Sequence, residues 1–425
     1  MRAAILVLCV LLTQPLSAQQ PSRLPERDRP LAGVPAVVFT IGREEGESWE
    51  LLSNVSGVDF DGAGNLYVLD AGNHRVLVLD GRGRLQRTIG KQGGGPGELL
   101  VPSGLAVLGD GTVVIADLGR SAFSVFNRDG SFRLNLPYAD SLGAPPPEQR
   151  GATPGVLAHP AGLAVFGSLR LAIGGPGGGG PPRPPTDVPV YVRPLDAKAP
   201  ARLLYRVPRE APVLRTSGDE NNRSVRSVPR AFSPQPAWGV LPGGGIVVVP
   251  GNTPEYRLQL IGANGGVQRT LARALEPRRP TRDDQERART LLAERMRSGE
   301  GMIRMEVRAG PGGTDRQVST GGPGGGAREA EIQAQLREME FADRVPVIAG
   351  VRTDPRGRIW VARTPRRIGD DGAIDLLDAQ GRYLGTLAPQ PLPDAVSTSG
   401  LAAYIVRDDM GVERVVVTRL PTGWQ

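Results

Sequence analysis

Residues 57–70 decide the fold, because the same pattern occurs again further along the chain. The stretch reads Gly57-Val-Asp-Phe-Asp-Gly-Ala-Gly-Asn-Leu-Tyr-Val-Leu-Asp70, and 47 residues later it returns without a gap as Gly104-Leu-Ala-Val-Leu-Gly-Asp-Gly-Thr-Val-Val-Ile-Ala-Asp117. Self-similarity with a period of about 20 to 50 residues is the sequence signature of repeat architectures. We therefore interpret this 425-residue chain as a repeat protein.

Three further copies match less closely. They begin at Pro160-Ala-Gly-Leu-Ala-Val165, which is similar to Pro102-Ser-Gly-Leu-Ala-Val107, at Pro236 and at Gly350. Each copy has a short apolar strand, a turn rich in Asp and Gly, and a second strand rich in Val and Ile. A second hairpin follows in register, as at Val76–Leu85. Four strands per copy predict the blade of a β-propeller.

The two ends of the chain supply the sixth copy. Residues 401–406 and 412–420 predict strands without a fourth partner, and Phe39-Thr-Ile-Gly42 matches Arg87-Thr-Ile-Gly90 at the end of the first copy. We expect residues 36–42 to pair with residues 412–420, because this pairing closes the ring and removes an open sheet edge. The prediction is an all-β, six-bladed β-propeller over residues 34–420, closed by an N-terminal strand.

The first two copies resemble the NHL repeat, in which a Gly-Asn-Leu-Tyr-Val-x-Asp strand leads into Asn-x-Arg-Val-x-Val-Leu-Asp. The matching residues are Gly64-Asn-Leu-Tyr-Val-Leu-Asp70 and Asn73-His-Arg-Val-Leu-Val-Leu-Asp80. The linker Ile89-Gly-Lys-Gln-Gly-Gly-Gly-Pro-Gly-Glu98 is also similar to that of secreted bacterial six-bladed propellers in this group. The resemblance implies a secreted bacterial propeller.

Residues 1–18 predict a secretory signal peptide. Arg2 is followed by the apolar run Ala3–Leu12, and a small residue, Ala18, ends the segment. The run is too short to span a bilayer, which takes about 20 residues. We therefore expect a secreted or periplasmic protein without a transmembrane segment, cleaved near Ala18. The mature chain then has a linker at 19–33, a tail at 421–425, and no cysteine for a disulfide, because Cys9 is the only one.

The formal net charge of +7 does not predict a nucleic-acid ligand. All but two of the 51 basic residues are arginines, which are spread among 44 acidic residues. A surface for single-stranded nucleic acid needs a basic groove interleaved with aromatic side chains, and no such run is present. We expect a monomer that binds no nucleic acid.

Two insertions interrupt the repeat. Residues 174–185 are Gly and Pro with one Arg, which predicts a loop. Residues 276–344 predict two amphipathic helices joined by a flexible Gly-rich break at 309–326, because apolar residues recur at helical spacing on either side of it. The insertion is either a packed structural excursion or a lid or partner-binding element.

The candidate metal ligands are few and scattered. With only His74 and His159, a three-histidine zinc site cannot form. Gluconolactonase-like propellers hold a divalent cation with oxygen ligands at the starts of inner strands, a set suited to calcium. The equivalent positions here are Asn54, Ser103, His159, Gln235, Asp343 and Ser399. We expect no cofactor beyond weak Ca²⁺ binding, and we take Asn54, His159 and Asp343 as candidates for the channel mouth.

A recurring polar set follows the second strand of the first two copies: Asp70, Asn73, Arg75, Asp117 and Arg120. Asp and Asn can accept backbone N–H bonds at a turn, and we expect each Arg to pair with the Asp of the neighbouring blade. We interpret the set as structural. In the fifth copy Arg363 replaces the Asp, so that role is not shared by all blades.

The chain predicts a binding scaffold for a protein, peptide or glycan, without a catalytic site. No nucleophile elbow, P-loop or dinucleotide fingerprint follows a strand. The alternative is a divalent-metal-dependent, gluconolactonase-like hydrolase or lyase that acts in the central channel. Channel-facing carboxylates with tight calcium binding would favour the enzyme.

Overall fold

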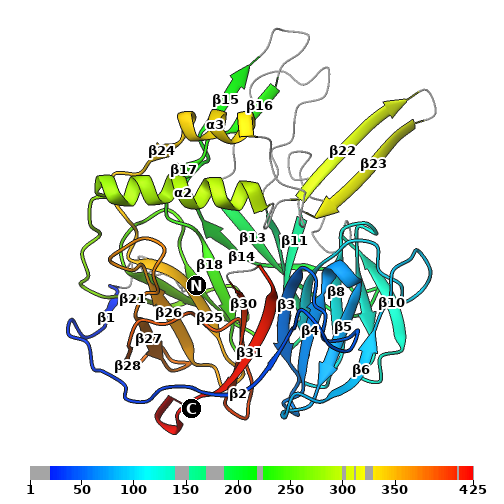
Figure 1. Ribbon diagram of the computed structural model, residues 1–425. Helices are drawn as coiled ribbons and strands as arrows, with labels where there is room; N and C mark the ends of the chain where they lie inside the picture. The colour runs from blue at the N-terminus through cyan, green and yellow to red at the C-terminus, as the bar shows by residue number, and fades with distance from the viewer. Residues whose placement is uncertain are drawn as a thin grey trace, which may run out of the picture.

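The computed structural model describes residues 20–138, 153–168, 186–217, 224–298, 303–310, 313–320, 329–408 and 411–424. Six sheets within them form the blades of a propeller, and the first strands of successive blades contact one another around the centre (Figure 1). The chain is a six-bladed β-propeller. No helix in the described ranges is long and apolar enough to cross a membrane.

Each blade runs from an inner to an outer strand in chain order. Blades 1 to 3 consist of β3 (Val55–Phe60), β4 (Leu66–Asp70), β5 (Arg75–Leu79) and β6 (Leu85–Ile89); β7 (Pro102–Val107), β8 (Val113–Asp117), β9 (Ala122–Phe126) and β10 (Phe132–Pro137); and β11 (Thr153–His159), β12 (Gly162–Ser168), β13 (Asp187–Arg193) and β14 (Arg202–Pro208).

Blades 4 to 6 keep the same order. They consist of β18 (Ala237–Val240), β19 (Ile246–Val249), β20 (Arg257–Ile261) and β21 (Val267–Ala272); β25 (Ile348–Thr353), β26 (Ile359–Arg363), β27 (Ile374–Leu377) and β28 (Tyr383–Leu387); and β29 (Ala395–Val396), β30 (Leu401–Arg407) and β31 (Glu413–Arg419) with β2 (Ala36–Ile41).

The core lies between neighbouring blades, and one strand serves two interfaces. All five residues of β4 are buried. Leu66 and Val68 pack in the cluster shared with blade 6, whereas Tyr67 and Leu69 pack in the cluster shared with blade 2. Successive side chains of a strand point to opposite faces of its sheet, so a strand buried on both sides must be apolar throughout. This requirement explains the Val- and Ile-rich second strand of each copy.

The ring closes through the chain ends. Strand β2 pairs antiparallel with β31, with Ile41 opposite Val415 and Ala36 opposite Arg419. The predicted pairing of residues 36–42 with residues 412–420 is therefore confirmed. The ring of Phe39 packs into the blade 6 and blade 1 cluster.

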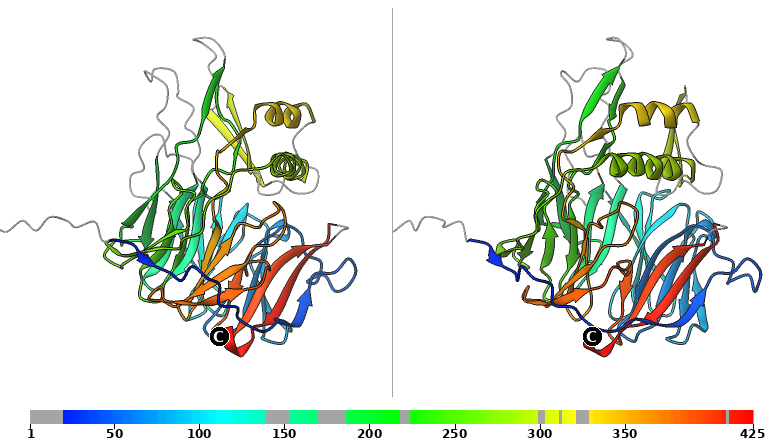
Figure 2. Two further views of the ribbon diagram at one scale, coloured as in Figure 1. Left: turned by 90° about the vertical axis from the view of Figure 1, so that its left-hand side faces the viewer. Right: turned by 60° about the vertical axis from the view of Figure 1, so that its left-hand side comes forward.

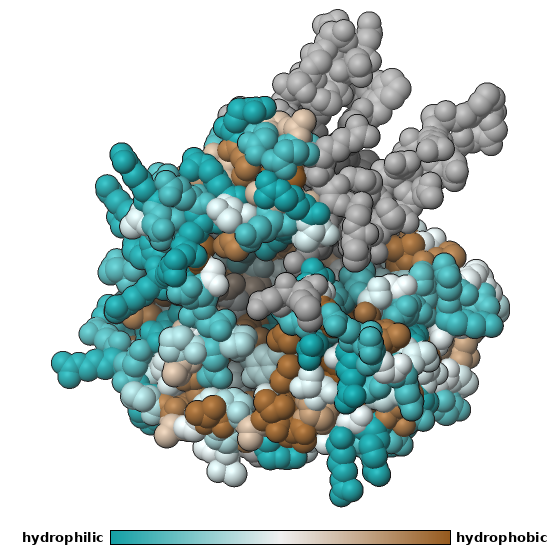
Figure 3. All heavy atoms as spheres, viewed as in Figure 1, coloured by the Kyte–Doolittle hydropathy of each residue, from teal (hydrophilic) through white to brown (hydrophobic). Residues whose placement is uncertain are grey.

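The outer side of β2 remains open. Val34, Val37 and Val38 are exposed, with Val34 at 85% of its full accessible surface. Figure 3 shows apolar residues at the lower edge of this view, where β2 lies. Strand β2 is therefore held from one side, by β31 and by the packing of Phe39.

Residues 20–35, which we call the strap, cross the outer strands of blades 4 and 5 before β2 joins blade 6 (Figure 1). Strand β1 (Ser22–Arg23) pairs in parallel with β21, and Pro30 forms a bridge with Thr386. The indole Nε1 of Trp424, in the 3-10 helix Thr422–Trp424, donates to Ala32 O at 2.9 Å. The strap includes most of the predicted linker, and it is bound along its length.

Residues 276–344, which we call the cap, lie between blades 4 and 5 and confirm the predicted helical insertion. They contain α2 (Arg282–Ser298), α3 (Glu329–Glu338), β22 (Ile303–Gly310), β23 (Gly313–Thr320) and β24 (Glu340–Phe341). Figure 2 shows the cap standing above one face of the propeller. The helices pack through Ala293, Met296 and Ile332.

A capping box fixes the start of α2. Asp284 N donates to Thr281 Oγ1 at 3.2 Å, and Thr281 N donates to Asp284 Oδ2 at 2.8 Å. Hydrogen bonds from the Arg278 guanidinium hold the pKa of Asp284 well below its usual range. Arg278 also donates to Arg366 O at 2.9 Å, in a loop of blade 5. These contacts fasten the helix to the propeller.

Two details of the sequence interpretation are wrong. The stretch that we took as a flexible break at 309–326 contains most of the antiparallel β22–β23 hairpin, because its glycines flank the β-favouring run Gln317–Thr320. The third copy was also placed one strand too late. Its inner strand is β11, and Pro160–Val165 forms the turn and second strand, where Gly162 supplies the turn with φ of 129°. The predicted loop at 174–185 lies outside the described residues.

Candidate functional site

The two faces of the propeller follow from its topology. Antiparallel strands place the blade-to-blade segments and the turns between second and third strands on one face, which we call the upper face. The other turns lie on the lower face. The cap and residues 209–236, which we call the connector, are both blade-to-blade segments and rise from the upper face (Figure 1).

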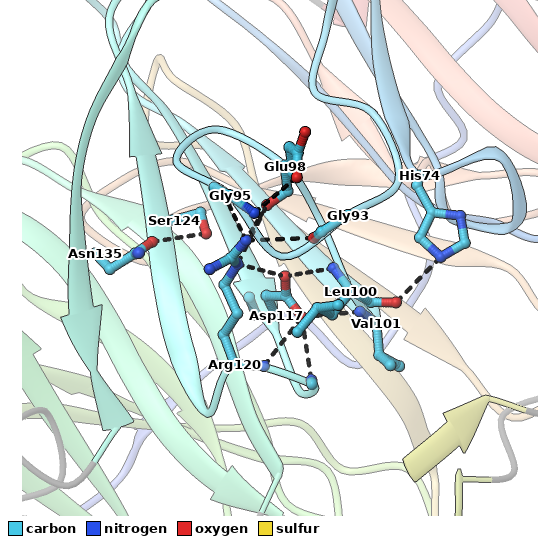
Figure 4. Close-up of polar contacts among 12 residues, drawn as sticks. His74, Gly93, Gly95, Glu98, Leu100, Val101, Asp117, Arg120, Ser124 and Asn135 are labelled. Atoms are coloured by element: carbon cyan, nitrogen blue, oxygen red, sulfur yellow. Dashed lines mark hydrogen bonds and ion pairs between the residues drawn. The ribbon is translucent and has the colours of Figure 1, made fainter. Parts of the chain in front are cut away.

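Asp117 and Arg120 hold the linker that enters blade 2 (Figure 4). The Asp117 carboxylate accepts the backbone N–H groups of Leu100 and Val101, both at 2.9 Å. Arg120 Nη2 donates to Gly95 O at 2.7 Å and to Glu98 O at 2.9 Å. The two side chains also form an ion pair at 3.5 Å. One buried acid and one arginine therefore fasten the Gly-rich linker to the turn after β8.

Blade 1 repeats this arrangement. Asp70 accepts Ser53 N at 2.8 Å, Asn73 Nδ2 at 2.9 Å and Arg75 Nε at 2.8 Å. Arg75 Nη2 donates to Ser48 O at 3.0 Å. The expectation that each Arg pairs with the neighbouring blade's Asp is wrong. The Arg follows the Asp within the same short turn, so it reaches the acid of its own blade first.

The three candidates for the channel mouth do not come together. Asn54 precedes β3 on the upper face with φ of 55°, and Asp343 is exposed after β24. His159 ends β11 on the lower face, because the inner strand of blade 3 begins earlier than expected. Its Nε2 lies 3.0 Å from Gly244 O, its Nδ1 accepts Ala161 N at 3.0 Å, and burial lowers its pKa. His159 therefore joins two lower-face turns.

The other proposed cation ligands are also dispersed. Ser103 Oγ donates to Ala116 O at 3.2 Å, and Gln235 Nε2 donates to Ser233 O at 3.2 Å. Ser399 lies in the lower-face turn between β29 and β30, 3.0 Å from Ser397 Oγ. In the part of the chain that the structure describes, no three His, Cys, Asp or Glu residues are grouped to hold a metal ion.

The connector contains a pocket that the sequence analysis missed. Its volume is about 220 Å³, and its lining residues are Arg209, Glu210, Ala211, Pro212, Val213, Val228, Pro229, Arg230, Ser233, Pro234, Gln235 and Pro236. Four prolines in this short segment were the available signal. They have a fixed φ angle and no N–H group, so they make the pocket walls rigid, with apolar rings beside the polar groups of the other lining residues.

Backbone hydrogen bonds place the pocket where the propeller, the connector and the cap meet. Arg209 N donates to Thr186 O before β13, and Glu210 N donates to Gly251 O after β19, both at 2.8 Å. Across the connector, Val228 N donates to Val213 O at 2.9 Å. Strand β17 (Arg230–Ala231) pairs in parallel with β24 of the cap. Between these two sides of the connector, the chain forms a hairpin of β15 (Leu214–Ser217) with β16 (Ser224–Ser227).

Of the two arginines that line the pocket, one forms an ion pair with Glu210 and the other bonds only to a backbone oxygen among the described residues. Arg230 Nη1 lies 3.3 Å from Glu210 Oε2, which forms an ion pair. Arg209 donates from Nε to Glu210 O at 3.2 Å, and no acidic side chain among the described residues pairs with it. Burial lowers the pKa of the Arg209 guanidinium. Within the described part of the chain, the pocket therefore contains one arginine, Arg209, that forms no ion pair.

A strained aromatic residue borders the pocket. Phe232 has φ of 63°, a conformation that is a genuine outlier for a bulky side chain. Its ring lies 6.0 Å from the ring of Phe341 in the cap, and the Arg289 guanidinium of α2 lies 4.8 Å over Phe341. These contacts join the connector to the cap next to Ser233.

A comparison with protein families agrees with the propeller fold. Residues 46–138 match the family model DUF5128, described as a 6-bladed beta-propeller. No curated protein matches the chain.

Solved structures with a related arrangement include a member of the DUF4221 family from Bacteroides vulgatus, at 9% identity and a TM-score of 0.46, covering 91% of this chain and 98% of that one. Another is the calcium-binding protein regucalcin from Agrobacterium tumefaciens, at 15% identity and 0.38, covering 94% and 97%. A third is a gluconolactonase from Xanthomonas campestris, at 12% identity and 0.34, covering 92% and 98%. None of these likenesses bears on the activity of this chain.

Proposed function

We propose that this propeller is a binding scaffold for a protein, peptide or glycan, and that the ligand binds in the connector pocket on the upper face. The observation that carries the proposal is the preformed pocket itself. Its walls are fixed by backbone hydrogen bonds to blades 3 and 4 and by strand pairing with the cap. A site that is ordered before binding loses less conformational entropy when the ligand arrives.

The repeated geometry of the first two blades supports a scaffold role. Asp70 and Asp117 are fully buried, and their oxygens accept hydrogen bonds from the blade linkers and neighbouring arginines. Carboxylates engaged in this way hold loops in place. The upper face thereby offers a rigid platform beside the pocket.

The cap tests the proposal, because its two ends meet. Val345 N donates to Arg278 O at 2.8 Å, so a short Gly/Ser bridge can join these residues and replace the segment between them. The change removes β24, which pairs with β17 of the connector beside the pocket. We expect the bridged variant to keep the propeller fold, since its strands are untouched, and to lose ligand binding.

The measurement uses the protein from residue 19 onward against a phage-displayed random peptide library and a glycan array. Circular dichroism and thermal unfolding of both proteins report whether the bridged variant folds. Retention of every ligand by a folded bridged variant contradicts a role for the cap. If the intact protein retains neither a peptide nor a glycan, the scaffold proposal is wrong.

The proposed location is outside the cytoplasm, as a secreted or periplasmic protein. This part of the proposal is supported by the sequence of residues 1–18. Expression of the full chain in a bacterial host, followed by N-terminal sequencing of the exported fraction, tests it. We expect the mature chain to begin near Gln19, and a protein that keeps Met1 in the cytoplasm contradicts it.

A further inference from the structure

We propose that the connector pocket binds a carboxylate group of a peptide ligand, and that Arg209 is the residue that holds it. The proposal rests on the proposed function and names the class of ligand. The carboxylate can be the C-terminus of the peptide or an acidic side chain, since both present the same two oxygens.

Charge balance is the first argument. Glu210, the acid that lines the pocket, is engaged by Arg230 at 3.3 Å. Among the described residues, the Arg209 side chain forms one hydrogen bond, from Nε to the backbone oxygen of Glu210. A partly buried guanidinium loses hydration, and an anion restores the lost interactions. Its fork of N–H donors fits both oxygens of a carboxylate.

The neighbouring wall residues favour a peptide over a free ion. Pro212, Pro229, Pro234 and Pro236 line the pocket, and their pyrrolidine rings suit the apolar part of an amino acid. Ser233 and Gln235 add polar groups able to bond to a peptide backbone. The ligand therefore has to combine a carboxylate with an apolar stem.

The size of the pocket sets the length of the recognised segment. A volume of about 220 Å³ is smaller than the roughly 300–1,000 Å³ typical of sites for drug-sized ligands. It accommodates one or two residues of a chain. The rest of the peptide then lies outside the pocket, along the connector or the cap.

The test compares three pools of fluorescent hexapeptides by anisotropy. The first pool has free C-termini and no Asp or Glu, the second has amidated C-termini with Asp or Glu, and the third is amidated and has no acid. We expect the third pool to bind at least about tenfold more weakly than one of the others, since a charge-assisted hydrogen bond is lost. The better of the first two pools identifies the source of the carboxylate.

Variants assign the effect to Arg209. Arg209→Met should weaken binding of the acidic pool by about tenfold or more, and Arg209→Lys should weaken it less, because lysine keeps the charge without the fork. The matched control is Arg269→Met, whose exposed side chain donates to Gln380 O on the outer part of blades 4 and 5. The control should bind as the parent does.

Glu210→Gln gives a prediction of opposite sign. It releases Arg230 from its ion pair, so the acidic pool should bind severalfold more tightly. If Arg209→Met fails to fold, Glu210→Gln and Arg209→Lys test whether Arg209 binds the carboxylate. Equal binding of all three pools overturns the carboxylate proposal, and so does unchanged binding of the acidic pool by folded Arg209 variants. Neither result contradicts the scaffold proposal. Absence of any peptide or glycan binding overturns both.

Discussion

Buried aspartates paired with arginines lie at the upper ends of blades 1 and 2 and also of blade 5. In blades 1 and 2 these residues are close in the sequence, whereas in blade 5 they come from distant parts of the chain. In blade 2, Asp117 and Arg120 lie three residues apart and hold a local linker. In blade 5 the equivalent of Asp117 is Arg363, and the buried acid is Asp375 on the third strand. Asp375 pairs with Arg273 at 2.8 Å, at the end of blade 4.

The strap completes the blade 5 arrangement. Asp28 lies 2.6 Å from Arg273 and 2.9 Å from Arg363, and Thr386 Oγ1 donates to Asp375 at 2.6 Å. In all three blades a buried carboxylate is paired with arginine and holds a neighbouring segment of the chain. The positions of the residues that form this interaction differ between blades 1 and 2 and blade 5. Blades 1 and 2 are fastened locally, whereas blade 5 depends on residues from the far end of the chain.

Deleting residues 19–44 should give the largest effect. It removes the strap and β2, so blade 5 loses Asp28 and blade 6 loses its outer strand. We expect the free energy of unfolding to fall by about 3–6 kcal/mol, because ladder and core contacts are lost together. Urea denaturation measures it. An unchanged melting temperature would refute the proposed dependence of blades 5 and 6 on the N-terminal segment.

Asp375→Asn should come second. The change removes one of the two carboxylates that pair with the buried Arg273 and leaves Asp28 as the other, and breaking a buried ion pair typically costs about 3–5 kcal/mol. Asp371→Asn, at an exposed position just before β27, is the matched control and should unfold as the parent does. If the two variants have equal stability, the charge cluster does not fasten blade 5.

Asp117→Asn should cost less, at about 1–3 kcal/mol, because Asn keeps one acceptor oxygen for the linker N–H groups. The same denaturation series measures it. Hydrogen exchange should locate the loss at residues 91–101, the linker that Asp117 fastens. If Asp117→Asn lowers the free energy of unfolding more than Asp375→Asn does, the local contacts of blade 2 contribute more to stability than the long-range contacts of blade 5, contrary to this prediction.

Two carboxyl groups should respond to pH with opposite signs. Burial opposes ionisation of Asp28, but hydrogen bonds from Arg363 and Arg273 prevail and lower its pKa below 3.8. The stabilisation is present above pH 3.8 and is lost as the pH falls through the lower folded value. The stability advantage of the parent over Asp28→Asn should therefore shrink in acid.

Asp59, on the inner strand of blade 1, should show the reverse. Burial raises its pKa to about 6, although it accepts the N–H groups of Val107 and Phe60. The folded state then binds more protons than the unfolded state between pH 3.8 and about 6. As the pH falls from 7 to 4, the parent should gain stability relative to Asp59→Asn. Thermal unfolding from pH 7 to 4 checks the Asp59 trend, and its extension below pH 3.8 checks the Asp28 trend. Parallel trends of the two variants contradict the prediction.

The smallest expected effect is that of metal removal. We predict no stoichiometric zinc and at most weak calcium binding, because Asp70 and Asp117 are engaged by arginine and backbone donors. Elemental analysis of protein purified without chelator, with melting temperatures in EDTA and in calcium chloride, measures this. Stoichiometric metal would instead support the alternative hydrolase or lyase.

Local chemistry explains which parts of the fold were predictable. The turn glycines and the Val- and Ile-rich second strands are determined within a few residues, so blades 1, 2 and 5 and the closing strand follow from the sequence. The third blade was misplaced because Gly162 in a turn and Gly104 in a strand occur in similar surroundings. Sequence cannot distinguish a glycine needed for positive φ from one that packs closely.

The pocket depends on contacts between distant segments, which explains why it escaped sequence analysis. Thr186, Gly251 and β24 position its walls, and no local pattern relates them to Arg209. The contact of His159 with Gly244 also escapes sequence analysis, because Gly244 belongs to another blade. The partners of Asp117 lie close to it in the sequence, so local chemistry alone suggests a structural role for this residue.

The pairing of β2 with β31 also constrains the order of events during synthesis. A ribosome makes residues 36–41 long before residues 413–419, so β2 has no strand partner until β31 has been synthesised. Ring closure is therefore possible only for a chain that extends through β31. A chain cut short upstream of β31 leaves the valines of β2 without a sheet, a product that a cell can recognise and degrade.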